Sequence, residues 1–220
     1  MSDDSLANIL MIEAEQLLEM YNEDQSQENL LNNAIQGAKR AVQITRANHV
    51  TGLSLLATCL YHRIQKRFSL DDFDQALEAV QEMSSLAHDG PESQLEASQL
   101  LTKLYKQRFD ALREPSDLDA AIAFGQTCAN STAIEPSQQL THLINLSTLQ
   151  SDRFDLLRRA DDAESAVGSA RQAEELANGM DPAEQASAAA AVGAALLRLC
   201  LAGRQLDGVD QLNPAIEKNQ

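Results

Sequence analysis

Aromatic side chains and glycines are scarce in this sequence. It has no tryptophan, and its 220 residues include only 5 Phe, 3 Tyr and 9 Gly. An aromatic-lined cavity of the kind that prenyl-diphosphate chemistry needs is therefore poorly supported, and so is base stacking on single-stranded nucleic acid. No GxGxxG or GK[ST] string is present. Glycine-rich loops for ATP or dinucleotides are thus excluded.

Positive charge is also in short supply. Lys and Arg number 17 against 33 Asp and Glu, for a formal net charge of -16, and no basic residue precedes Lys39. Such a surface repels phosphate backbones and anionic headgroups, which predicts no nucleic-acid and no membrane partner. A protein or peptide partner with a basic surface fits better. The start of the chain has none of the positive charge that opens a secretory signal.

Cysteines and long apolar runs are few as well. Cys59, Cys128 and Cys200 are odd in number, far apart and set in apolar segments, which favours neither a disulfide framework nor a metal knuckle. A reducing, intracellular and cytoplasmic setting is predicted. The longest uncharged apolar stretch, 186–197, ends at Arg198. Because roughly 20 such residues are needed to cross a bilayer, we expect a packed helix rather than a membrane anchor.

A repeat of 45 residues organises the chain. Four arginines recur at this interval, and an aspartate follows each of them by nine residues. Apolar columns keep the same register, among them Ile64, Phe109, Phe154 and Leu199. An earlier copy aligns at a spacing of 42 and has Tyr21 in place of the arginine. The arginines and aspartates are Arg63, Arg108, Arg153, Arg198, Asp72, Asp117, Asp162 and Asp207.

Each copy predicts a helical hairpin, because apolar residues recur three and four apart. Prolines at 91, 136 and 182 indicate the starts of first helices, and acids or serines at 71–74, 116–119 and 161–164 indicate capped starts of second helices. The predicted helices are 4–22, 28–47, 50–68, 71–88, 91–110, 116–130, 136–157, 161–178, 182–202 and a short last one near 206–212. Gly203, Gly208 and Pro214 weaken this last helix.

These hairpins predict an all-α fold, a right-handed α-solenoid of stacked antiparallel helical hairpins. The whole chain, 1–220, is expected to form one domain. Its predicted copies are 4–49, 50–90, 91–135, 136–180 and 181–217.

The strings LATCLYHR (56–63) with LDDFDQAL (70–77), and LYKQRF (104–109) with DLDAAI (117–122), resemble a known family. They are similar to the long tetratricopeptide-like repeats of fungal multidomain proteins that carry caspase-like CHAT or nucleotide-binding NACHT modules. The resemblance covers about residues 10–202. It implies a protein-interaction or sensor region whose catalysis, where present, lies in another domain.

The arginine and aspartate columns have two interpretations. Four guanidinium groups in a row could recognise acidic ligands. Alternatively, each arginine near the end of a first helix pairs with the aspartate at the start of the second, where the two charges also suit the helix dipoles. We favour the second interpretation, because a repeated fold requires polarity in register, whereas a binding site normally occupies one place along a solenoid.

Other candidate sites have weaker patterns. The acids Asp71, Asp72 and Asp74 could attract a metal ion, but Ala76 stands where an EF-hand loop needs glycine. The four histidines lack the HxxxH spacing of a zinc site. Cys59 with His62 could pair as nucleophile and base, yet both lie in a segment that packing explains. We therefore predict no catalytic, metal or cofactor residues.

The leading functional prediction is a non-catalytic module that holds a peptide or protein domain on its concave face. The alternative is a structural domain that forms homo-oligomers through its terminal repeats, helped by the alanine-rich helix 182–202. A pocket for a small molecule or a hidden enzyme site between helices is a third possibility, because sequence alone does not show pockets.

Overall fold

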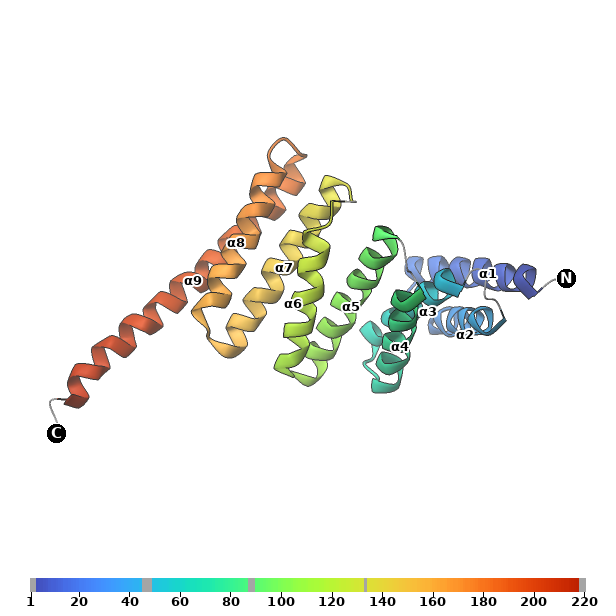
Figure 1. Cartoon of the computed structure of the whole chain (residues 1–220), viewed down its shortest axis with the longest axis horizontal. Helices are drawn as coiled ribbons and strands as arrows, with labels where there is room; N and C mark the ends of the chain where they lie inside the picture. The colour runs from blue at the N-terminus through green and yellow to red at the C-terminus, as the bar shows by residue number, and fades with distance from the viewer. Residues whose placement is uncertain (1–2, 45–48, 87–89, 133, 218–220) are drawn as a thin grey trace. The chain divides into compact units, whose positions relative to one another are not determined.

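The computed structural model describes residues 3–44, 49–86, 90–132 and 134–217, with side chains described as far as Gly203 and Pro91 excepted. Within these ranges every regular element is a helix (Figure 1). The helices are α1 (Asp3–Glu23), α2 (Glu28–Ile44), α3 (His49–Lys66), α4 (Leu70–Leu86), α5 (Pro91–Leu112), α6 (Pro115–Ala129), α7 (Pro136–Leu157), α8 (Ala160–Ala177) and α9 (Pro182–Glu217). The all-α prediction is confirmed.

Eight of the nine predicted helices before the final one begin and end within about two residues of the observed bounds, where those bounds fall in the described ranges. The predicted ends at 47 and 88 fall on residues outside those ranges. Helix starts at Pro91, Pro136 and Pro182 are confirmed. Proline fits there because the N–H groups of the first helical turn have no partner within the helix. A residue that lacks an N–H therefore loses no hydrogen bond at this position.

The chain divides into two compact parts, Met1–Arg113 and Glu114–Gln220. The N-terminal part holds α1 to α5, and the C-terminal part holds α6 to α9. The boundary falls inside the predicted copy 91–135, between its two helices. Whether the two parts act as the single domain predicted for 1–220 stays a prediction.

The N-terminal part is built of antiparallel hairpins stacked in chain order. Helix α3 packs against α2 and α4 and also contacts α1 and α5, so the first helices of successive hairpins are neighbours. Small residues let α1 and α2 approach closely: a Cβ added at Gly37 would lie 3.3 Å from the Cβ of Ala14. Phe73, Val80 and Met83 lie on the core-facing side of α4 and are fully buried.

The C-terminal part repeats this arrangement. Helix α7 packs against α6 and α8, and α9 packs against both α7 and α8. Phe154 on α7 is fully buried with Ala163 and Ala202, and Leu199 packs against the same cluster. A second cluster joins Ala166, Val167 and Ala170 of α8 to Ala195 of α9. Helix α8 is therefore fitted to its neighbours mainly by alanine.

The predicted break after residue 202 is wrong. Helix α9 runs without interruption from Pro182 to Glu217, through Gly203, Gly208 and Pro214. A single glycine costs a helix only about 1 kcal/mol, and the residues on both sides of Gly203 are good helix formers. No turn therefore separates Arg198 from Asp207, and the fifth copy has no second helix packed against its first.

The prediction of acidic caps on the second helices is also wrong in detail. The N-caps of α6 and α8 are Glu114 and Arg159, neither of which caps through its side chain. The first-turn acids lie two or three residues after these N-caps, where a negative charge interacts favourably with the positive end of the helix dipole. Helix α9 does have a capping box: Asp181 Oδ1 accepts hydrogen bonds from the N–H groups of Ala183 and Glu184, at 2.8 and 3.0 Å.

One described helix segment, Pro182–Gly203, is long and apolar enough to cross a membrane by length and composition alone. Only 17% of its apolar window is buried, although the helix packs against α7 and α8 along one side. Its buried residues Ala188, Ala195 and Ala202 recur every seven positions. Together with the partly buried Ala191, Val192 and Leu199, these alanines form the side of α9 that packs on α7 and α8.

Candidate functional site

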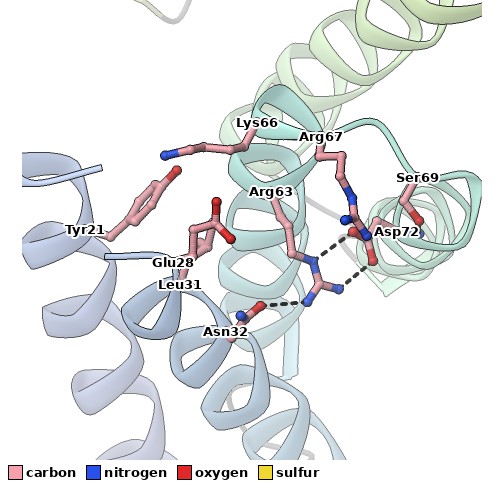
Figure 2. Close-up of a pocket in the computed structure, with 9 residues that line it drawn as sticks. All are labelled: Tyr21, Glu28, Leu31, Asn32, Arg63, Lys66, Arg67, Ser69 and Asp72. Carbon is pink, nitrogen blue, oxygen red and sulfur yellow. Dashed lines mark hydrogen bonds and ion pairs between the residues drawn. The ribbon is translucent and has the colours of Figure 1, made fainter. Parts of the chain in front are cut away.

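The Arg63–Asp72 pair closes the second hairpin as predicted. Arg63 Nε and Nη2 donate to the two carboxylate oxygens of Asp72, at 2.8 and 2.5 Å, so the guanidinium grips the carboxylate with two parallel bonds. Its Nη1 donates to Asn32 Oδ1 on α2, at 3.1 Å. Figure 2 shows this one side chain bridging α2 and α4. Arg63 thereby joins its own hairpin to the preceding one.

Arg153 makes the corresponding pair in the C-terminal part, with both contacts on one carboxylate oxygen. Its Nε and Nη2 lie 2.8 and 2.6 Å from Asp162 Oδ1, and its Nη1 lies 2.7 Å from Asp119 Oδ1 on α6. Burial disfavours the charge of Arg153, but the hydrogen bonds to Asp162 and Asp119 outweigh it and raise the pKa of the guanidinium. The Asp162 side chain is 4% exposed. The arginine therefore neutralises a buried carboxylate.

Arg198 contacts a different residue. Its Nε and Nη2 lie 3.0 and 2.8 Å from Asp155 Oδ2 on α7. The side chain of Asp207, its predicted partner, lies outside the described residues, so the Arg198–Asp207 pair stays a prediction. Because α9 continues as a helix past Gly203, the turn that brings arginine and aspartate together in the other hairpins is missing here.

Arg108 and Asp117 fall on opposite sides of the boundary between the two parts, so their pairing also stays a prediction. Within the N-terminal part, the Arg108 guanidinium carbon lies 4.4 Å from the ring centroid of Phe73 and 5.1 Å from that of Tyr105. Asp117 is fully buried in the first turn of α6.

The second contact of each arginine was not predicted from the sequence. Asn32 and Asp119 occupy equivalent positions of the repeat, in the column that also contains Asp74. The first two columns are recognised because their polar residues recur at the interval of the repeat. The polar residues of this third column recur at the same interval. One residue from each column forms a set of three side chains, which we call a linkage. It consists of an arginine, the aspartate of its own hairpin and the polar residue of the preceding second helix.

A cavity of about 370 Å³ opens beside the first linkage, within the N-terminal part. It lies between the end of α1, the start of α2, the end of α3 and the start of α4 (Figure 2). Its walls combine basic, acidic and polar side chains: Tyr21, Glu28, Leu31, Asn32, Arg63, Lys66, Arg67, Ser69 and Asp72. No sequence pattern predicts this pocket, although the first copy has Tyr21 in place of an arginine.

The acid cluster at the start of α4 is engaged in helix contacts. Asp72 pairs with Arg63, and Asp71 Oδ2 accepts a hydrogen bond from Gln75 Nε2 at 2.6 Å. No group of three or more His, Cys, Asp or Glu side chains suited to a metal ion occurs among the described residues. The Asp72 N–H points to Ser69 Oγ at 3.4 Å, so Ser69 rather than an aspartate stands at the N-terminal end of α4.

Cys59 is fully buried on α3, and desolvation raises the pKa of its thiol to about 12. A thiol with this pKa forms almost no thiolate at neutral pH, and the thiolate is the reactive species. Burial also lowers the pKa of His62, with the nearby charge of Lys103 acting in the same direction. The geometry thus gives Cys59 a packing role.

Comparison with known proteins does not identify a family for this chain. No protein-family model matches the chain. No curated protein matches it either. Among solved structures, a de novo designed helical repeat protein is similar over 93% of this chain and 98% of its own, at 16% identity and a TM-score of 0.38. The stacked helical hairpins are seen in the chain's own helices and contacts, and the tetratricopeptide-like type suggested by the sequence stays a proposal.

Proposed function

We propose that this chain is a non-catalytic, intracellular protein-interaction module of the tetratricopeptide-like type, which binds a partner with a basic surface. The observation that carries the proposal is the exposed side of α1, the first helix of the first hairpin. Ile9, Ile12 and Met20 are 43%, 54% and 51% exposed there. Large apolar side chains gathered on one exposed helix face are typical of contact surfaces.

Helical spacing places these three residues on one stripe together with Glu13 and Glu23, opposite the buried face of α1. We call this stripe the outer face of α1. The first 30 residues contain eight acids and no base. An amphipathic segment with basic flanks would cover the apolar side chains and meet the carboxylates at their edge. The concavity of the layer formed by the first helices stays a prediction.

Substitutions on this outer face are expected to abolish partner capture. We expect Ile12→Ser with Met20→Ser to remove the apolar contact, and Glu13→Lys with Glu23→Lys to repel a basic partner. Quantitative mass spectrometry of pull-downs from the source cell's lysate measures the loss against the unchanged chain. Because all four side chains are exposed, far-UV circular dichroism is expected to stay the same.

The matched control is Leu70→Ser with Leu86→Ser on α4, where the side chains are 53% and 47% exposed. This control removes a similar apolar area away from α1. The proposal fails if both α1 variants capture the same proteins as the unchanged chain, or if the α4 control loses them equally.

A second candidate function, self-association, is favoured by the surface of α9. Leu196, Leu197 and Leu201 are 36%, 63% and 39% exposed. Leu197 and Cys200 stand where α7, one repeat earlier, has Asp152 and Asp155. A half-buried acid and an acid that pairs with Arg198 on α7 thus correspond to apolar residues on α9. The described part of α9 has few charges, so a second copy of this acidic chain could approach it with little repulsion.

Light scattering at increasing concentration separates the two functions. We expect the unchanged chain to reach the mass of a dimer at tens of micromolar, and Leu197→Asp with Cys200→Asp, which restores the residues of α7, to stay monomeric. A strict monomer at that concentration excludes the second candidate and leaves the first untouched.

A further inference from the structure

The cavity beside Arg63 is located where the repeat is broken. Tyr21 replaces the first arginine, and two basic residues, Lys66 and Arg67, appear at the end of α3. The equivalent positions of the next two copies hold Ala111 and Leu112, then Leu156 and Leu157. The repeat requires no positive charge at these positions. The stacking of hairpins therefore does not explain why Lys66 and Arg67 are basic. Both residues line the cavity.

The turn that carries Arg67 is also unlike its counterparts. After α5 and α7 the chain passes through a left-handed residue, Arg113 or Arg158, with φ values of 60° and 56°. These two arginines lie 5.2 and 5.5 Å from the ring centroids of Phe109 and Phe154. At the end of α3 the corresponding residue is Phe68, which has no positive φ. The α3–α4 turn therefore departs from the repeat in its backbone as well as its charge.

The contacts of the three cations differ. All the donor nitrogens of Arg63 are used by Asp72 and Asn32. Lys66 donates to the carbonyl oxygen of Gln25, and its Nζ lies 5.8 Å from the ring centroid of Tyr21. Within the described ranges, no hydrogen bond or ion pair joins the Arg67 guanidinium to another side chain. Figure 2 shows this side chain at the edge of the cavity beside Asp72 and Ser69.

We propose that this cavity binds a carboxylate group, held by the Arg67 guanidinium with Lys66 as a second cation. A guanidinium presents paired N–H donors that match the two oxygens of a carboxylate. The walls hold three basic and two acidic side chains, and Asp72 is already neutralised by Arg63. Glu28 and the chain's net charge of -16 both disfavour a doubly charged phosphate. A singly charged oxyanion fits this balance better.

The carboxylate could belong to a free small molecule or to an acidic side chain of another protein, and two probes distinguish these sources. One is sodium acetate, which carries a single negative charge, and the other is acetyl-Gly-Glu-Gly-amide, whose blocked ends leave one carboxylate. Each is titrated into the full chain at low ionic strength, and NMR follows the Nε–Hε signal of Arg67. We expect a saturable shift with at least one probe and none with acetyl-Gly-Gln-Gly-amide. The probe that binds identifies the source.

Arg67→Leu places the residue of the next two copies at this position, so the turn is expected to fold normally. Backbone amide signals around the cavity report binding in this variant, and the affinity is expected to fall about tenfold, as for the loss of a charge-assisted hydrogen bond. Arg171→Leu, the same charge change on an exposed residue of α8, is the matched control and should bind like the unchanged chain.

Three results would overturn the proposal: no saturable shift with either carboxylate, equal weakening in Arg67→Leu and Arg171→Leu, or tighter binding of inorganic phosphate than of both probes. The inference does not depend on the outer face of α1. Failure of carboxylate binding leaves the interaction proposal standing, and loss of partner capture leaves the cavity untouched.

Discussion

Arg153→Ala is expected to lower the free energy of unfolding by about 3 kcal/mol, because it leaves a buried carboxylate without its countercharge. Asp162 is 4% exposed, and Arg153 is the partner that its Oδ1 contacts in two places. Its Oδ2 is buried and accepts no hydrogen bond within the described residues, so no alternative donor is in place. Urea denaturation followed by far-UV circular dichroism measures the loss.

The repeat itself supplies the control for this experiment. Arg198→Ala removes the equivalent arginine, whose partner Asp155 is 43% exposed. A carboxylate that water reaches does not need the pair, so we expect a loss of about 1 kcal/mol or less. Equal losses in the two variants would show that burial of Asp162 does not matter. Replacing Arg153 and Asp162 together by apolar residues should recover part of the stability.

Phe154→Ala is expected to cost about 4 kcal/mol, through lost apolar contact and the cavity that remains. Phe154 is fully buried, and the side chains of its neighbours Ala163 and Ala202 are too small to fill the space that it leaves. The equivalent positions of other copies hold Ile64 and Leu199. Phe154→Leu is therefore the matched control, and we expect it to cost about 1.5 kcal/mol or less.

Both Phe154 variants can be measured in the same urea series. Because repeat proteins can unfold in stages, hydrogen exchange should locate the loss in α7 and α8 rather than in α1 to α5. A loss for Phe154→Ala no greater than for Phe154→Leu would mean that the alanine-rich neighbours collapse into the space.

Sequence alone was enough for the first eight helices and for the Arg63–Asp72 and Arg153–Asp162 pairs. Regular spacing of Arg63 and Arg153 with their aspartates reflects a contact that is made in both of these hairpins, so the sequence pattern reveals it. The third column, Asn32 and Asp119, follows the same rule between hairpins. It was missed because asparagine and aspartate differ in charge although either oxygen can accept the bond.

Other features depend on balances that a pattern does not show. The sequence predicts a break at Gly203, yet a glycine costs a helix little and α9 continues past it. The cavity depends on the path of the α3–α4 turn and on the direction of Arg67, which no spacing rule contains. The exposed Ile9, Ile12 and Met20 look like core residues in the sequence, and only packing shows that they face water.

The linkage built by Arg63 and by Arg153 has an evolutionary consequence. Each arginine reaches backwards to a single polar side chain, and that acceptor can be Asn32 or Asp119. Because the arginine can bond to either acceptor, a gene in which one hairpin was duplicated or deleted would still encode neighbouring hairpins whose polar side chains pair. We expect such chains to change length in whole hairpins, with each new junction already compatible at the moment it arises.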